Sequence, residues 1–96
     1  MNKRKNILIG GVTGGIGSSV AKMLSRESHT ISGYARSKDK MIEFESECPS
    51  IHSFTADATD TTDLASTFKA AREVMGSIDI YIPVSYTHLT LPTTTI

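Results

Sequence analysis

The chain has 96 residues, of which 39% are hydrophobic and 21% charged, which is the composition of a single ordinary globular domain. Ten basic and ten acidic residues balance, so no charge excess points to nucleic acid or a membrane surface as a partner. Only three strongly apolar residues follow the basic start at residues 3–5, too few for a signal peptide or a membrane span.

Residues 7–19 predict a phosphate-binding element. The apolar run at 7–9 predicts a buried strand, and Ile16, Val20 and Leu24, four residues apart, predict one buried face of a following helix. The glycine-rich turn between them would bring the backbone close to a ligand. The first turn of the helix would then offer unpaired N–H groups and a partial positive charge to an anion. A turn that binds no ligand is the alternative.

The glycine spacing does not fit the dinucleotide fingerprint G-x-G-x-x-G, because its third glycine would fall at Val20. It fits G-x-x-x-G-x-G through Gly11, Gly15 and Gly17. It also fits G-x-x-G-x-x-G through Gly11, Gly14 and Gly17, so both spacings stay open.

The middle of the chain alternates strands and helices. Residues 29–34 predict a second strand, and Ser37 is a suitable cap for a short helix that ends at Pro49. Met41, Phe44 and Cys48 form the apolar side of this helix, which favours a core role for the lone cysteine. A single cysteine cannot form an internal disulfide, and this suits a reducing, cytoplasmic location.

Residues 51–56 predict a third strand and residues 78–82 a fourth. Between them a helix begins at residues 60–63 and ends at Gly76, with a buried stripe of Leu64, Phe68, Ala71 and Met75. The order β-α-β-α-β-α-β with right-handed crossovers predicts an α/β fold, the N-terminal half of a Rossmann-type doubly wound parallel sheet.

Three segments together resemble the short-chain dehydrogenase/reductase superfamily. Gly-Val-Thr-Gly-Gly-Ile-Gly at 11–17 is similar to the family's cofactor loop, although Gly10 stands where the family usually has threonine, whose hydroxyl helps to hold the loop. Residues 55–60 resemble its Asp-Val element, and residues 76–82 its Gly-x-Ile-Asp-Ile-Leu-Val strand. The resemblance implies that the cofactor contacts these loop residues: Gly11, Thr13, Gly14, Gly15, Ile16 and Gly17.

The residues after the second strand predict which dinucleotide binds. NAD enzymes place a carboxylate there, whereas NADP enzymes place an arginine against the 2′-phosphate. Alignment with the family's Gly-Arg-x-x-x-Lys-Leu puts Ala35 at the acid position and Arg36 at the phosphate position, with Ser37 and Lys38 able to assist. NADP is therefore expected rather than NAD, unless Arg36 is only a solvated surface residue.

Asp57 and Ala58 would contact adenine by the same resemblance, although Asp57 could instead be a turn or cap residue. The family's catalytic Ser and Tyr-x-x-x-Lys would lie further along the chain. Tyr34 and Lys38 match that spacing but span a strand end and a turn, so they are not predicted to be catalytic. No metal ligand is predicted in the chain either.

The resemblance therefore implies that the chain is an inactive, cofactor-binding fragment of an NAD(P)-dependent oxidoreductase for a carbonyl or alcohol. Only the full-length parent, expected to be a homo-oligomer, would bind the small-molecule substrate. Two alternatives stay open. One is a non-catalytic dinucleotide-binding regulatory module, and the other is a sugar-nucleotide epimerase of the extended branch, which the second glycine spacing permits.

Residues 1–82 are expected to form the NADP-binding half-domain and 83–96 a non-native tail. Where the family has Asn-Asn-Ala-Gly, residues 84–93 read Val-Ser-Tyr-Thr-His-Leu-Thr-Leu-Pro-Thr. These ten residues resemble the translation of a transposon-based sequencing adapter, since GTC TCT TAT ACA CAT CTG ACG CTG CCG ACG would encode all ten. A divergent, threonine-rich loop is the alternative. A tail encoded by adapter DNA would not belong to the native protein, so these residues are left out of the fold prediction.

Overall fold

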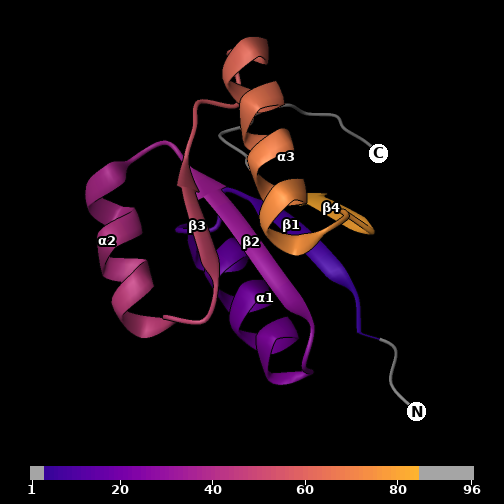
Figure 1. Ribbon diagram of the computed structural model, residues 1–96. Coiled ribbons are helices and arrows are strands. Elements are labelled where there is room, and N and C mark those ends of the chain that lie inside the picture. The colour runs from indigo at the N-terminus through magenta and orange to yellow at the C-terminus, as the bar shows by residue number, and fades with distance from the viewer. Residues whose placement is uncertain (1–3, 85–96) are drawn as a thin grey trace, which may run out of the picture.

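The computed structural model describes residues 4–84, which form one parallel sheet covered on both faces (Figure 1). The strands are β1 (Asn6–Gly10), β2 (Thr30–Ala35), β3 (His52–Thr55) and β4 (Ile80–Pro83). They lie in the order β3-β2-β1-β4, and every neighbouring pair is parallel. This confirms the predicted half of a doubly wound fold.

The helices connect the strands and divide between the two faces. They are α1 (Gly15–Arg26), α2 (Lys38–Glu47) and α3 (Thr61–Met75). Helices α1 and α2 pack against one face of the sheet and α3 against the other (Figure 1). Within residues 4–84, no helix is long and apolar enough to cross a membrane.

Alternation along β1 supplies both cores, because successive side chains of a strand point to opposite faces. Ile7 and Ile9 pack with α1 and α2, whereas Leu8 packs with α3. All three are at most 2% exposed, as expected for a central parallel strand with both faces covered. Cys48 lies in the first core, which confirms the role predicted for it.

The predicted helix-capping residues Ser37, Asp60 and Gly76 are confirmed, while α2 ends at Glu47, two residues before Pro49. Ser37 caps α2 by accepting a hydrogen bond from the Lys40 N–H at 3.3 Å. Asp60 caps α3 by accepting from two backbone N–H groups at 3.0 and 3.2 Å, and Gly76 ends this helix. The strands differ from their predicted bounds by one or two residues, a shift that hydrophobic patterns do not resolve.

The buried face predicted for the first helix was wrong at Ile16, whose side chain is 72% exposed. Val20 and Leu24 pack against the core only in part, while Gly17 and Ala21 are the buried residues of α1. These two small residues let the helix approach the sheet closely. The face that they define is rotated from the predicted one, which turns Ile16 toward solvent.

Asn6 fastens the start of β1 to the segment that enters β4. Its backbone N–H donates to the Asp79 carboxylate at 2.8 Å, and its carbonyl accepts from the Asp79 N–H at 2.8 Å. Its side-chain amide donates to the Met75 carbonyl at 3.1 Å and to the Ser77 hydroxyl at 3.0 Å. The predicted tail at 84–93 lies, after Val84, outside the described residues.

Candidate functional site

The turn between β1 and α1 leaves a helix N-terminus open. Gly11 has a φ of 70°, in the left-handed region that glycine adopts without strain. Gly14 occupies the cap position without a side-chain cap, and the first intrahelical bond runs from the Ser18 N–H to the Gly14 carbonyl at 2.8 Å. The N–H groups of residues 15–17 therefore precede the hydrogen-bond ladder of α1. This arrangement is typical of an anion site.

Gly17 lets α1 pack directly on the turn. A Cβ at this position would overlap the Gly11 carbonyl oxygen and lie 3.1 Å from the Val12 Cα. At Gly14 the nearest atom would be 3.5 Å away, an ordinary contact, and at Gly15 nothing would lie within 4 Å. The two predicted glycine spacings share Gly11 and Gly17, which are the positions that the geometry demands.

The carboxyl ends of β1, β2 and β3 meet at one edge of the sheet and enclose a cavity of about 600 Å³, here called the main cleft. Such an edge is where ligands bind in open α/β sheets. Seven of the predicted site residues line the cleft: Gly11, Thr13, Gly14, Arg36, Ser37, Asp57 and Ala58. The other three, Gly15, Ile16 and Gly17, form the adjoining first turn of α1 instead.

The rim after β2 carries positive charge and no carboxylate. Ala35, at the position where NAD enzymes have an acid, is 5% exposed and lines the cleft. Arg36 follows it with an exposed side chain. Lys38, which the sequence suggested as a helper, is not among the lining residues, whereas Lys40 is. The difference arises because α2 begins at residue 38 and its first turn presents the two lysines in different directions.

The floor after β3 carries one organised carboxylate. Asp57 Oδ1 accepts from the Thr59 N–H at 2.9 Å and from the Thr59 hydroxyl at 2.7 Å. These bonds, with a smaller contribution from the positive charge of Arg36, hold the pKa of Asp57 below its ordinary value. Its own N–H donates to Asp63 Oδ2 at 2.8 Å. Asp57 thus has the turn role considered in the sequence and also faces the cleft.

A family model for short chain dehydrogenases matches residues 5–85. The chain belongs to the short-chain dehydrogenase family. Comparison with curated proteins gives no match.

Solved structures of the family share the fold at low identity. A short-chain type dehydrogenase/reductase from Mycobacterium ulcerans is 20% identical with a TM-score of 0.81, covering 88% of this chain and 34% of that one. A short-chain dehydrogenase/reductase from Brucella melitensis, described as a glucose/ribitol dehydrogenase, is 23% identical with a TM-score of 0.81, covering 90% of this chain and 38% of that one. A 3-ketoacyl-(acyl-carrier-protein) reductase from the same species, complexed with NADH, is 24% identical with a TM-score of 0.75, covering 80% and 32%. The chain thus spans about a third of the length of these relatives.

One departure from the family pattern has a structural counterpart. Gly10 pairs with Tyr34 across β1 and β2, and the Tyr34 ring occupies the space where a Gly10 side chain would lie. The Tyr34 hydroxyl is 2.5 Å from the Tyr81 hydroxyl of β4, and Phe68 packs edge-on against Tyr81. The Tyr34 carbonyl also accepts from the N–H groups of Gly11 and Val12, at 2.9 and 3.1 Å. The Tyr34 backbone carbonyl therefore holds the start of the turn between β1 and α1, while its ring fills the space beside Gly10.

Sequence reasoning missed several residues of the main cleft, among them Tyr34, Lys40 and Thr59. Thr59 was detectable, since a hydroxyl two residues after an aspartate is a common turn partner. Lys40 was detectable too, since it falls at the lysine of the Gly-Arg-x-x-x-Lys-Leu pattern, whereas the position of Tyr34 depends on strand register. The two residues of the Tyr-x-x-x-Lys spacing lie on different elements, because Tyr34 is a buried strand residue and Lys38 begins the next helix.

Proposed function

We propose that the chain binds NADP in the main cleft, as the cofactor-binding part of an NADP-dependent oxidoreductase for a carbonyl or alcohol. The observation that carries this proposal is the rim after β2, where Arg36 is exposed at the cleft and buried Ala35 replaces an acid. An arginine fork suits a 2′-phosphate, while a carboxylate at this place would repel it.

The other contacts follow from the geometry of the site. The uncapped first turn of α1, at residues 15–17, suits the pyrophosphate, since its N–H groups and helix dipole favour an anion. The Ser37 hydroxyl accepts the capping bond of α2 and still has its own proton to donate to a phosphate oxygen. Asp57 is ionised at neutral pH and can accept from the adenine amino group, with the Ala58 backbone beside it.

The bound dinucleotide would supply a hydride, and the chain's residues would bind and orient it. We further propose that this chain does not itself turn over substrate, since the catalytic Tyr-x-x-x-Lys that the family resemblance implies is not matched at a suitable place in it. On this proposal residues 1–82 form the cofactor-binding unit. A longer, homo-oligomeric parent would bind the small-molecule substrate.

The test is the ratio of the Kd values for NADH and NADPH, followed through the fluorescence of the reduced cofactors. Two or three charge-assisted hydrogen bonds to the 2′-phosphate should favour NADPH by roughly tenfold or more. Arg36→Ala should remove most of this preference, whereas Arg72→Ala, an exposed arginine on α3, should leave it unchanged. An equal ratio in all three proteins would show that Arg36 does not bind phosphate.

A further inference from the structure

A second cavity, here called the side cavity, adjoins the main cleft between the α1 N-terminus and α2. Its volume is about 310 Å³, and its lining consists of Thr13, Ser18, Lys40, Glu43, Phe44 and Glu47. Thr13 and Lys40 also line the main cleft. Lys40 therefore lies at the boundary between a cavity with an arginine rim and a cavity with two glutamates.

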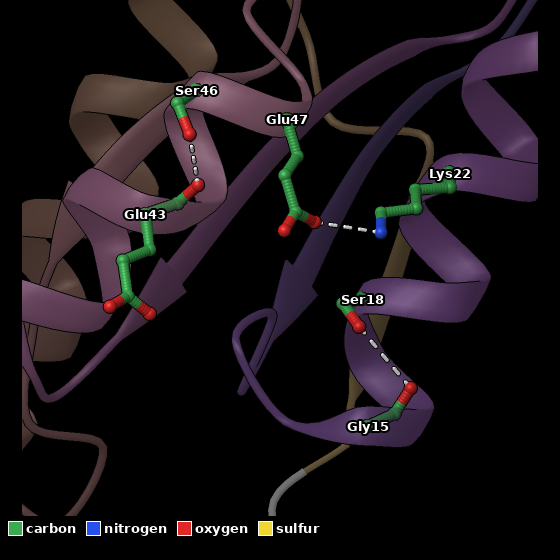
Figure 2. Close-up of polar contacts among 6 residues, drawn as sticks. All are labelled: Gly15, Ser18, Lys22, Glu43, Ser46 and Glu47. Atoms are coloured by element: carbon green, nitrogen blue, oxygen red, sulfur yellow. Dashed lines mark hydrogen bonds and ion pairs between the residues drawn. The ribbon is translucent and has the colours of Figure 1, made fainter.

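The two glutamates differ in charge pairing. Glu47 forms an ion pair with Lys22 of α1, with 2.8 Å between Oε1 and Nζ. The Glu43 carboxylate makes no contact with the other residues shown in Figure 2. Lys22–Glu47 is the salt bridge found within residues 4–84, so Lys40 has no ion pair in the described part of the chain. Lys40 and Glu43 are three residues apart on α2 and share one side of it.

Helix stability does not explain a lysine at position 40. It lies in the first turn of α2, where the helix dipole favours acids such as Asp39 and disfavours cations. Its side chain is exposed, and its long stem lets the ammonium reach either cavity. A ligand anion beside Arg36 would give this unpaired charge a partner.

We propose that Lys40 is a second specificity-determining residue for the cofactor, pairing with the anionic group beside Arg36, and that Glu43 competes for the same ammonium. The inference rests on the proposed NADP binding in the main cleft. Lys40 acts as a flexible point charge, in contrast to the planar fork of Arg36. Lys38, in the same helical turn, lines neither cavity and has no part in this pairing.

The first test compares two matched variants of the 96-residue chain. Lys40→Met keeps most of the aliphatic side chain and removes the charge. It should lower the NADPH preference over NADH by about threefold to tenfold, a loss between the free energy of an exposed ion pair and that of a charge-assisted hydrogen bond. Lys38→Met, the control, should change the preference by less than about twofold, because the exposed Lys38 side chain lines neither cavity and its charge is screened by salt. The effect of Lys40→Met should shrink as salt is raised.

The second test removes the competitor. Glu43→Gln should strengthen NADPH binding by about twofold to threefold, the size of a weak exposed ion pair, without affecting NADH. Glu45→Gln, an exposed acid of the same helix that lines neither cavity, should leave both Kd values unchanged.

The outcomes separate this inference from the proposed function. If Arg36→Ala removes the NADPH preference while Lys40→Met leaves it intact, the inference is wrong and the proposed function stands. A Lys40→Met variant that weakens NADH and NADPH equally also overturns the inference, because its stem would then matter only for packing. If the chain binds neither cofactor measurably, both proposals fail.

Discussion

A threonine introduced by Gly10→Thr should destabilise the protein, although the family resemblance favours threonine there. An ideal Cβ at Gly10 would lie 2.5 Å from the Tyr34 hydroxyl oxygen and 2.7 Å from its Cζ, whereas ordinary contacts begin near 3.4 Å. The hydroxyl would have to retreat by about 0.9 Å. Tyr34 is 3% exposed and its hydroxyl is bonded to Tyr81, so little space is available for that movement. Overpacking of this kind costs about 1–3 kcal/mol.

A double-mutant cycle with Tyr34→Val, followed by urea denaturation monitored by circular dichroism, tests whether Tyr34 occupies this space. Tyr34→Val alone should cost about 2–5 kcal/mol through the cavity that it leaves. In the double variant the threonine fills part of that space. The double variant should therefore lose about 1 kcal/mol or more less unfolding free energy than the sum of the losses in the two single variants.

Tyr34→Phe provides the control for the hydroxyl. It removes the bond to Tyr81 but keeps Cζ, 2.7 Å from the added Cβ, so it should not rescue Gly10→Thr. Costs that add within about 0.5 kcal/mol in the valine cycle would show that Tyr34 does not occupy the space above Gly10. Rescue by phenylalanine would assign the clash to the hydroxyl alone.

Thr59→Val should raise the pKa of Asp57 toward its ordinary 3.8, measured by NMR titration, since the Thr59 hydroxyl is the first cause of the depression. Because the folded pKa is depressed, the stability linked to Asp57 is present above pH 3.8 and is lost as the pH falls through the folded pKa, so the variant should lose less on acidification. An unchanged pKa would exclude the hydroxyl bond. Asp60→Ala should lower the free energy of unfolding by about 0.5–2 kcal/mol through loss of the α3 cap, whereas Asp60→Asn should retain most of it; equal losses would mean that the cap contributes through charge alone. Sequencing the source DNA across codon 82 should give Asn-Asn-Ala-Gly or a close relative in place of residues 84–93, and the same tail in genomic sequence would contradict the adapter interpretation.

The fold could be predicted because each element carries its own local signal. The apolar run before the glycines, the caps at Ser37 and Asp60, and Gly76 each mark an element or its end without reference to the rest of the chain. Parallel pairing then brings the strand ends together, which is why Arg36 and Asp57, 21 positions apart in sequence, line one cleft.

The remaining features depend on tertiary geometry. Tyr34 lies over Gly10 because of the register between β1 and β2, which no local pattern specifies. Ile16 is exposed because the close packing of Gly17 sets the rotation of α1. Lys40 reaches two cavities only through the position of α2 beside α1. Strand register, helix rotation and helix position depend on contacts between elements, whereas hydrophobic periodicity describes one element at a time.

The strand order also has a kinetic consequence. Strand β1 pairs with β2 across a separation of about 24 residues, but with β4 only after about 73, as their flanking contacts show. The longer loop adds only about 1 kcal/mol of closure entropy, so it delays the pairing of β1 with β4 and has little effect on stability. We expect β1, β2 and β3 to assemble first, leaving one edge of β1 open until β4 docks. The contacts of Asn6 would then form after the rate-limiting step, so Asn6→Ala should speed unfolding and leave the folding rate nearly unchanged.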